Sequence, residues 1–264
     1  MPNPILPFNE YIPDVEAHVY NGRVYLFGSH DKEDGERFCM LDYVLYSASI
    51  YDLSKWTYHG IIYKKKEDPR SKLNKLADYY APDIAIGNDN KFYLYYVAMG
   101  PNTTNFGPIS VAISDNICGP YKYFHDVTLD NKPLLKYLNN DPTILNDNGK
   151  IYLYYGWGLG RDFSNKLFRP LFNLVESKLF NRSIKEIKKT KPSILSCAFV
   201  ELKSNMYEAK SDPIAILDSK TTANKKSILY KHAFYEAPSI RKIKNLYYLI
   251  YSSNENNELC YATS

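Results

Sequence analysis

The sequence predicts an all-β fold built from propeller blades, and three observations support this class. A short aromatic strand recurs four times along the chain, and an acidic residue beside a proline lies 10 to 12 residues before the matching tyrosine of each copy. A further strand follows several of these copies. Units of short antiparallel strands that recur in this way are typical of propeller blades. A chain of 264 residues fits one all-β domain, so we assign residues 1–264 to a single propeller domain.

The aromatic strands are rich in β-branched and aromatic residues, and each begins beside Asn or Gly. Such segments indicate strands that follow tight hairpin turns. The four copies span residues 21–27, 90–96, 149–155 and 245–251. The strands expected after them cover residues 46–49, 109–114 and 261–264.

The acids that precede the aromatic strands occupy equivalent places in the repeat. They are Asp14, Asp83, Asp141 and Glu236. Their register places each acid on the first, innermost strand of its blade. We therefore expect acids from different blades to converge on the central axis although they are far apart in sequence.

A longer connection separates the third and fourth repeats. Within residues 161–191, apolar residues recur at roughly helical spacing, which predicts a helical or loop insertion on the third blade. These residues are Leu171, Leu174, Val175, Leu179 and Phe180. A lid or surface insertion is favoured over a partner-binding element, because loops commonly carry insertions.

Composition and charge exclude several classes of protein. The net charge is +4 with scattered lysines, and no concentrated basic face or nucleic-acid-binding module is present. The sequence contains no run of about 18 apolar residues, and such a run is what would predict a membrane span. The four cysteines show no metal-ligand spacing and resemble free thiols of a reducing compartment. With no secretory signal at the N-terminus, we expect a cytoplasmic protein. The 26 tyrosines suit both packed strands and a sugar-binding groove.

Converging carboxyl groups are the chemistry that glycosidic bond hydrolysis needs. One carboxyl group must be protonated to donate to the leaving oxygen, and a second must be ionised to activate water or to attack. A third carboxylate nearby raises the pKa of the acid by repulsion. Three acids on one propeller axis meet these requirements.

On these residues the chain resembles glycoside hydrolase family 43, which comprises five-bladed propellers active on arabinose- and xylose-containing glycans. The resemblance covers essentially the whole chain, and its motifs occur in the order of the repeat. They are Tyr11-Ile-Pro-Asp-Val-Glu-Ala-His-Val19, Gly28-Ser-His-Asp31, Tyr80-Ala-Pro-Asp83, Asp141-Pro-Thr-Ile-Leu145 and His232-Ala-Phe-Tyr-Glu-Ala-Pro-Ser-Ile240.

The resemblance implies a role for each acid. It makes Asp14 the general base, Glu236 the general acid, and Asp141 the residue that tunes the pKa of the acid. Asp83 would contact substrate, although it could equally anchor a turn. The remaining candidates for substrate binding, each with a structural alternative, are Trp157, His30, His232 and Arg241.

The resemblance also bears on metals and on the end of the chain. In the family, the fifth blade usually supplies a histidine that helps to hold a calcium ion, and no fifth repeat follows here. We therefore predict no metal site and no required cofactor.

The fourth repeat stops at Ser264, which aligns with Ser114, so we expect a propeller truncated within its fourth blade with the fifth missing. Open sheet edges predict self-association, poor solubility or weak activity of the isolated chain.

The resemblance thus predicts an inverting glycosidase acting on α-L-arabinofuranosyl or β-D-xylosyl linkages of oligosaccharides. An alternative is a non-catalytic sugar-binding propeller or inactive fragment. A mannoside phosphorylase of the same fold would need a cluster of phosphate-binding Arg and His residues, and the sequence assembles none. Pocket walls built from loops decide between arabinosidase and xylosidase, so the sequence leaves this question open, and it also leaves open the choice between exo and endo action.

Overall fold

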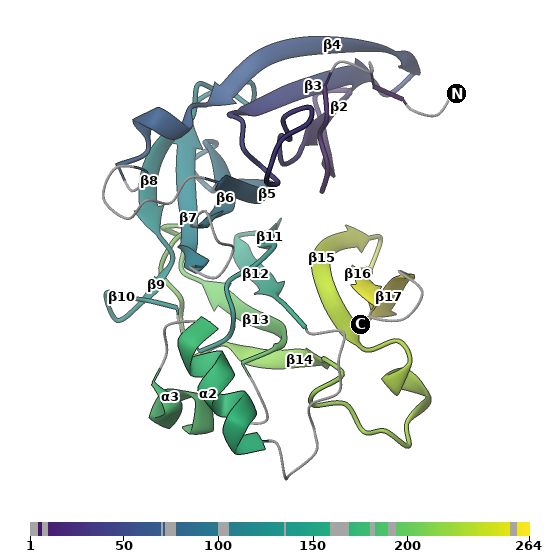
Figure 1. Ribbon diagram of the computed structural model, residues 1–264. Coiled ribbons are helices and arrows are strands. Elements are labelled where there is room, and N and C mark those ends of the chain that lie inside the picture. Colours follow the sequence, from purple (N-terminus) through teal and green to yellow (C-terminus); the bar gives the residue numbers. More distant parts are fainter. Residues whose placement is uncertain are drawn as a thin grey trace.

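The computed structural model describes residues 5–6, 10–69, 71, 78–99, 106–134, 136–158, 169–179, 183–189, 194–253 and 258–264. Four antiparallel sheets are arranged around a common axis as propeller blades (Figure 1). Each sheet follows the order of the chain, so each blade is a simple meander. The all-β class and the four predicted blades are confirmed, and the described residues form no fifth blade.

The first two blades contain four strands each. Blade 1 consists of β1 (Glu16–Tyr20), β2 (Arg23–Phe27), β3 (Tyr43–Ser49) and β4 (Asp52–Tyr63). A short 3-10 helix, η1 (Lys65–Glu67), follows it. Blade 2 consists of β5 (Asp78–Ile86), β6 (Phe92–Met99), β7 (Phe106–Ser114) and β8 (Lys122–Asp126).

A two-stranded ribbon, β9 (Thr128–Leu129) with β10 (Lys132–Pro133), leads into the second half of the molecule. Blade 3 consists of β11 (Thr143–Asp147), β12 (Lys150–Gly156), β13 (Ser196–Leu202) and β14 (Ile214–Asp218). After η2 (Ile228–Tyr230), blade 4 contains β15 (Phe234–Ile243), β16 (Leu246–Ser253) and β17 (Leu259–Thr263). The four aromatic repeats are therefore β2, β6, β12 and β16, the second strand of each blade, as the hairpin signals predict.

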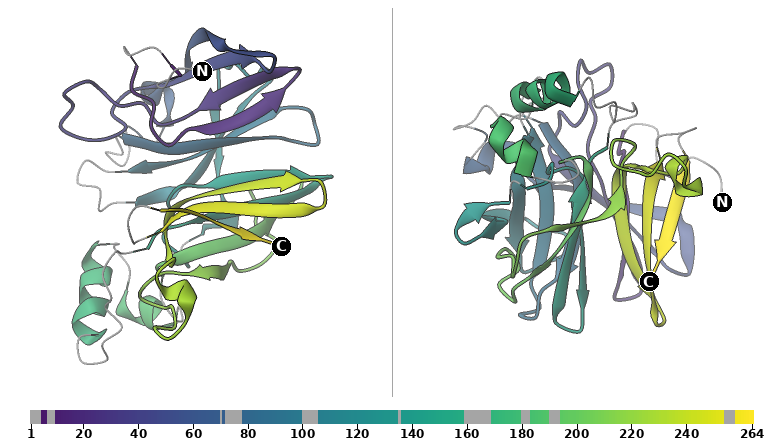
Figure 2. Two further views of the ribbon diagram at one scale, coloured as in Figure 1. Left: turned by 90° about the vertical axis from the view of Figure 1, so that its right-hand side faces the viewer. Right: turned by 90° about the horizontal axis from the view of Figure 1, so that it is seen from below.

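The insertion of the third blade is helical in its described part. Helices α2 (Arg169–Leu179) and α3 (Ile184–Lys189) lie between β12 and β13 and stand to one side of the sheets (Figure 2). The predicted position Phe180 and residues 161–168 and 190–191 lie outside the described residues. Among the described helices, none combines the length and apolar character needed to cross a membrane.

Apolar cores fill the spaces between neighbouring blades. One lies between blades 1 and 2, a second between blades 2 and 3, and a third between blades 3 and 4. The tyrosines contribute much of the first core, where Tyr43, Tyr63, Tyr79 and Tyr96 are almost completely buried. Their hydroxyls find partners, as a buried Tyr requires: Tyr63 and Tyr96 hydrogen-bond each other at 2.7 Å, and Tyr63 donates to Asp68. The tyrosine-rich composition is thus largely a consequence of blade packing.

The inner strands contain one departure from the predicted register. Asp83 and Glu236 lie within β5 and β15, but Asp14 and Asp141 lie two residues before β1 and β11. Both have left-handed backbone, with φ of 54° and 43°, which a regular β-ladder does not accept. Left-handed backbone also occurs at Asn and Asp residues in turns of this chain, such as Asn21 and Asn90, so for Asp14 and Asp141 it shows only that the inner strands begin after the acids.

Candidate active site

Asp14 is positioned by the close approach of the chain before β1 to the end of β2. Gly28 permits this approach, since a Cβ atom there would lie 2.7 Å from the carbonyl oxygen of Pro13. The buried hydroxyl of Ser29 donates to Asp14 Oδ2 at 3.1 Å and accepts from the backbone N–H of Ala81 at 2.7 Å. Ser29 therefore fixes the first acid and ties blade 1 to blade 2.

Asp141 and the fourth-blade acid are linked through the backbone. The N–H of Ala237, the residue after Glu236, donates to Asp141 Oδ2 at 2.9 Å. Ala237 also has left-handed backbone, with φ of 55°, at an irregularity in the pairing of β15 with β16. This local distortion directs the N–H of Ala237 toward the third blade, and it brings the carboxyl group of Asp141 next to the segment that carries Glu236.

Glu236 is held by Trp157, which follows β12. The indole Nε1 donates to Glu236 Oε2 at 3.1 Å. Gly158 allows the strands to meet, because its N–H bonds the carbonyl of Tyr235 and a Cβ there would lie 2.4 Å from the carbonyl of Phe234. The sequence left open whether Trp157 stacks on a sugar or packs in the core. The structure shows a further role, because Trp157 hydrogen-bonds the predicted general acid Glu236.

A pocket of about 270 Å³ lies at these residues. Its walls include Asp14, Asp141 and the Ala237–Pro238 segment that adjoins Glu236. Asp141 is repelled by both Glu236 and Asp14, so acids from blades 1, 3 and 4 lie close together. Asp14 is exposed, and Asp141 and Glu236 are partly exposed.

The electrostatics of the three carboxyl groups favours bound protons. Burial raises the pKa of Asp141 well above its usual range, and repulsion by Glu236 and Asp14 adds to the effect. Burial also raises the pKa of Glu236, opposed by the Trp157 hydrogen bond and assisted by Asp14. For Asp14 burial again raises the pKa, and the Ser29 bond opposes it. Because Asp141 and Glu236 repel each other when both are ionised, the pair retains one proton more tightly than an isolated carboxyl group does.

Asp83 lies in a different environment. Its carboxylate is fully buried and accepts from Thr143 Oγ1, from the N–H of Ile144 and from the N–H of Ile84, each at 2.8 Å. His18 Nε2 lies 2.5 Å from Oδ1. Burial alone would raise the pKa of Asp83, but attraction to His18 and these hydrogen bonds outweigh it, so the pKa is lowered. Asp83 is not part of the pocket wall, and this geometry favours its anchoring alternative over substrate contact.

The other three candidates are also engaged by the protein. The buried ring of His30 contacts the carbonyl of Asp42 and the carboxylate of Glu10, each at 2.7 Å. His232 Nδ1 lies 2.8 Å from Glu258. Arg241 donates to the carboxylate of Glu16 and to the carbonyl of Ile240, and so joins blade 4 to blade 1. Their predicted substrate contacts remain predictions, and each structural alternative now has named partners.

Glu16 is a site residue that the sequence analysis missed. It lines the same pocket as Asp14, and Ser239 Oγ donates to it at 2.9 Å. Burial and repulsion by Asp83 raise the pKa of Glu16 to about 7, against the attraction of Arg241 and His18. The sequence did contain a signal for it, since Glu16 lies two residues after Asp14 in the same motif, Tyr11–Val19.

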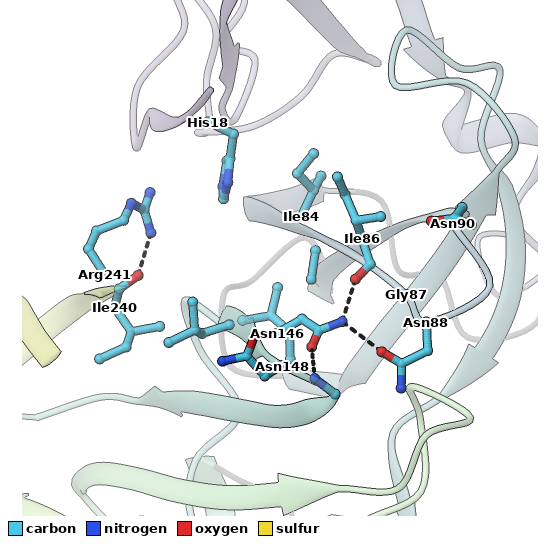
Figure 3. A pocket seen from close by; sticks show the side chains of 14 residues that line it. His18, Ile84, Ile86, Gly87, Asn88, Asn90, Asn146, Asn148, Ile240 and Arg241 are labelled. Carbon is cyan, nitrogen blue, oxygen red and sulfur yellow. Dashed lines mark hydrogen bonds between the residues drawn. The ribbon is translucent and has the colours of Figure 1, made fainter. Parts of the chain in front are cut away.

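A larger cavity of about 590 Å³ opens at the other end of the inner strands. Figure 3 shows His18 and Arg241 entering it from blades 1 and 4, and Asn88 and Asn146 facing each other from blades 2 and 3. The walls of this cavity include none of the three converging acids. The smaller pocket is therefore the candidate active site.

The axial residues do not fit the calcium ion found in the family. Ligand atoms of Glu16, His18 and Asp83 lie within 4.8 Å of one another. However, the oxygens of Asp83 are occupied by protein donors, and the guanidinium of Arg241 contacts Glu16. The absence of a required cofactor stays a prediction.

Comparisons with known proteins agree with the geometry. The sequence model described as glycosyl hydrolases family 43 matches residues 1–201. A xylosidase/arabinosidase of Thermoclostridium stercorarium is 36% identical over 267 residues, covering 99% of this chain and 49% of that protein. Xylosidase/arabinosidase 43A of Humicola insolens is 28% identical over 262 residues, covering 95% and 75%. The chain thus spans about half the length of the first relative and three quarters of the second.

Solved structures show the same fold. A GH43_1 enzyme from Xanthomonas citri, complexed with xylose, is 24% identical with a TM-score of 0.70, covering 99% of this chain and 72% of that one. CoXyl43, a β-xylosidase/α-arabinofuranosidase from a compost metagenome complexed with xylotriose, is also 24% identical, with a TM-score of 0.69 and coverage of 99% and 76%. At this identity the likeness supports the propeller architecture alone. The family model covers well over half of the sequence, and the chain therefore belongs to glycosyl hydrolases family 43.

Proposed function

We propose that this chain is an inverting glycoside hydrolase that acts on α-L-arabinofuranosyl or β-D-xylosyl linkages of plant-type glycans or their oligosaccharides. The observation that carries this proposal is that Asp14 and Asp141 line one pocket, that Glu236 lies close enough to Asp141 to repel it, and that all three carboxyl groups have a raised pKa. A glycosidase needs a carboxyl group that stays protonated near neutral pH, together with an ionised partner.

Each acid has a role in the proposed reaction. Glu236 donates its proton to the glycosidic oxygen as the bond to the anomeric carbon breaks. Asp14 accepts a proton from the water molecule that attacks this carbon from the opposite face, so configuration inverts. Trp157 orients Glu236 through its indole N–H, and Asp141 keeps a proton on the acidic pair by repulsion.

The substrate class comes from the relatives. Three of the relatives carry the name xylosidase/arabinosidase, and three of the similar structures are complexes with xylose or xylotriose. An oligosaccharide with terminal arabinofuranosyl or xylosyl residues is therefore the substrate to test. A sugar-binding protein without turnover is the alternative that the same experiment addresses.

The test compares aryl arabinofuranoside, aryl xyloside and the corresponding oligosaccharides. Glu236→Ala should lose most activity on oligosaccharides and retain more on aryl glycosides, because an activated leaving group needs little protonation. Asp14→Ala should abolish both activities. Glu201→Ala is the matched control, since Glu201 lies on β13 and pairs with Lys210 at the surface.

Three outcomes would contradict the proposal. Equal losses on both substrate types would reject Glu236 as the general acid. A first product with retained anomeric configuration, observed by proton NMR, would reject inversion. Sugar binding without any turnover by the unmodified chain would favour the binding alternative.

A further inference from the structure

Three side chains with metal-binding groups meet in blade 4, outside the candidate active site. His232 Nδ1 lies 2.8 Å from Glu258 Oε2, and Cys260 Sγ lies 4.0 Å from the same oxygen. All three ligand atoms lie within 4.8 Å of one another. The side chains are partly buried, so a small ion can reach them from solvent.

The fold brings these residues together from two segments. His232 lies between η2 and β15, whereas Glu258 directly precedes β17 and Cys260 is the second residue of that strand. Residues two apart in an extended segment point to the same face of the sheet. Leu259, between them, points to the other face, where it lines the pocket of the acids. The cluster is thus separated from the acidic pocket by the strand itself.

We propose that His232, Glu258 and Cys260 bind one zinc ion, with water in the fourth position. Imidazole, carboxylate and thiolate are all zinc ligands, and a site with three protein ligands and one water is a recognised zinc arrangement. Calcium and magnesium prefer oxygen ligands, so the thiol and imidazole discriminate against them.

The present distances are close to those of a tetrahedral site. Zinc bonds of about 2.0–2.3 Å place tetrahedral N, O and S ligand atoms roughly 3.3–3.6 Å apart. The His232–Glu258 distance of 2.8 Å is shorter than this, and the Cys260–Glu258 distance of 4.0 Å is longer. These two distances each need to change by about half an ångström, and the His232–Cys260 distance, which is at most 4.8 Å, needs to change by no more than about 1.3 Å.

Neighbouring groups support the ligands. Ser253 Oγ donates to Glu258 Oε2 at 3.3 Å, and the backbone N–H of Ser253 donates to the carbonyl of Glu258 at 2.9 Å. The hydroxyl of Tyr251 donates to the carbonyl of His232 at 3.0 Å. Such surrounding hydrogen bonds orient metal ligands and raise metal affinity.

Binding has a defined proton balance. The thiol of Cys260 becomes a thiolate and releases one proton to buffer. His232 binds through the Nδ1 lone pair, so its ring proton moves to Nε2, and the hydrogen bond from Nδ1 to Glu258 is replaced by two bonds to the ion. Zinc affinity should therefore increase with pH, as for other thiolate sites.

The experiment uses the full chain with any purification tag removed, because histidine tags bind zinc. Isothermal titration with zinc should give one ion per chain, and cobalt should give the thiolate-to-cobalt charge-transfer absorption of a cysteine-ligated site. Cys260→Ser should abolish this absorption and weaken zinc binding by more than about 100-fold, since even supporting residues contribute 10–100-fold. Glu258→Gln, which keeps the contact with His232, should also weaken zinc binding.

Cys118→Ser is the matched control, because Cys118 is also a partly buried free cysteine but lies in blade 2 near the start of β8. It should leave zinc affinity and the cobalt absorption unchanged. Equal zinc affinity in the Cys260→Ser, Glu258→Gln and unmodified chains would overturn the proposal. Loss of the cobalt absorption in Cys118→Ser, or calcium binding as tight as zinc binding at this site, would overturn it as well.

Discussion

Asp83 and Asp141 occupy equivalent places in successive blades, yet their environments push their pKa values in opposite directions. Asp83 accepts from two backbone N–H groups and from Thr143 and lies against His18, so its pKa is lowered. Asp141 accepts from one N–H and faces two other carboxyl groups, so its pKa is raised. A repeat therefore places an acid on the axis, but donors contributed by other blades decide whether it stabilises the fold or supports chemistry.

The largest expected effect is on catalysis. Asp141→Asn should reduce kcat/KM about 10³-fold, or about 4 kcal/mol in activation free energy, because the amide cannot hold a proton on the pair with Glu236. Asp83→Asn should retain far more activity per folded molecule. Steady-state kinetics on an aryl glycoside, normalised to the folded fraction, checks this difference. Equal losses in the two variants would remove the proposed distinction.

The second effect is on the free energy of unfolding, and here Asp83→Asn should cause a larger loss than Asp141→Asn. Asp83→Asn should lower the free energy of unfolding by about 3 kcal/mol, because it removes a fully buried carboxylate from its contact with the partly exposed His18 and from a hydrogen-bond network. Asp141→Asn should change it by less than about 1 kcal/mol or increase it, because an amide carries no desolvation penalty for charge. Urea unfolding at pH 7 measures both. A large loss for Asp141→Asn would show that its carboxylate is structural.

The pH dependence of these stability differences sharpens the comparison. A lowered pKa stabilises the folded state above the ordinary aspartate pKa of about 3.9, and this stability is lost as pH falls through the folded pKa. The penalty of Asp83→Asn should therefore decrease below about pH 4.

A raised pKa has the opposite sign, because the folded state loses stability as pH rises from about 3.9 through the folded pKa of Asp141. The relative stability of Asp141→Asn should therefore increase with pH across that window. Melting temperatures of the three chains between pH 3 and pH 8 check both trends. If melting temperature depended on pH in the same way for all three chains, the assigned directions of the pKa shifts would be contradicted.

The smallest effect concerns Trp157. Its hydrogen bond lowers the pKa of Glu236, so Trp157→Phe should raise that pKa and move the alkaline limb of the kcat/KM profile upward by less than about one pH unit. Trp56→Phe is the control, because Trp56 is the other of the two tryptophans and lies in β4 of blade 1. A downward shift for Trp157→Phe would refute the role of its indole N–H.

The sequence predicted the blades well because their signals are local. Turn residues and alternating aromatic strands determine hairpins within about 15 residues, and all four aromatic strands are confirmed. The convergence of Asp14, Asp141 and Glu236 followed from the register of the repeat. The helical insertion was also predicted from a local periodicity, and α2 and α3 confirm it for the described residues.

The partners of the acids could not be predicted, because they come from distant blades. Trp157 and Glu236 are 79 residues apart, and Thr143 and Asp83 are 60 apart. No local pattern distinguishes an aspartate with four donors from an aspartate with one. The left-handed backbone of Asp14 and Asp141 could not be predicted either, because neither residue is a glycine. The predicted cytoplasmic location and self-association stay predictions.

The most direct test is a carboxyl ¹³C NMR titration of the chain labelled at aspartate. Asn variants at positions 14, 83 and 141 assign the relevant signals. The account predicts that Asp141 titrates above the ordinary aspartate pKa of about 3.9 and Asp83 below it. If both carboxyl groups titrated near the ordinary value, or in the reverse order, the proposed division between a structural and a functional acid would be wrong.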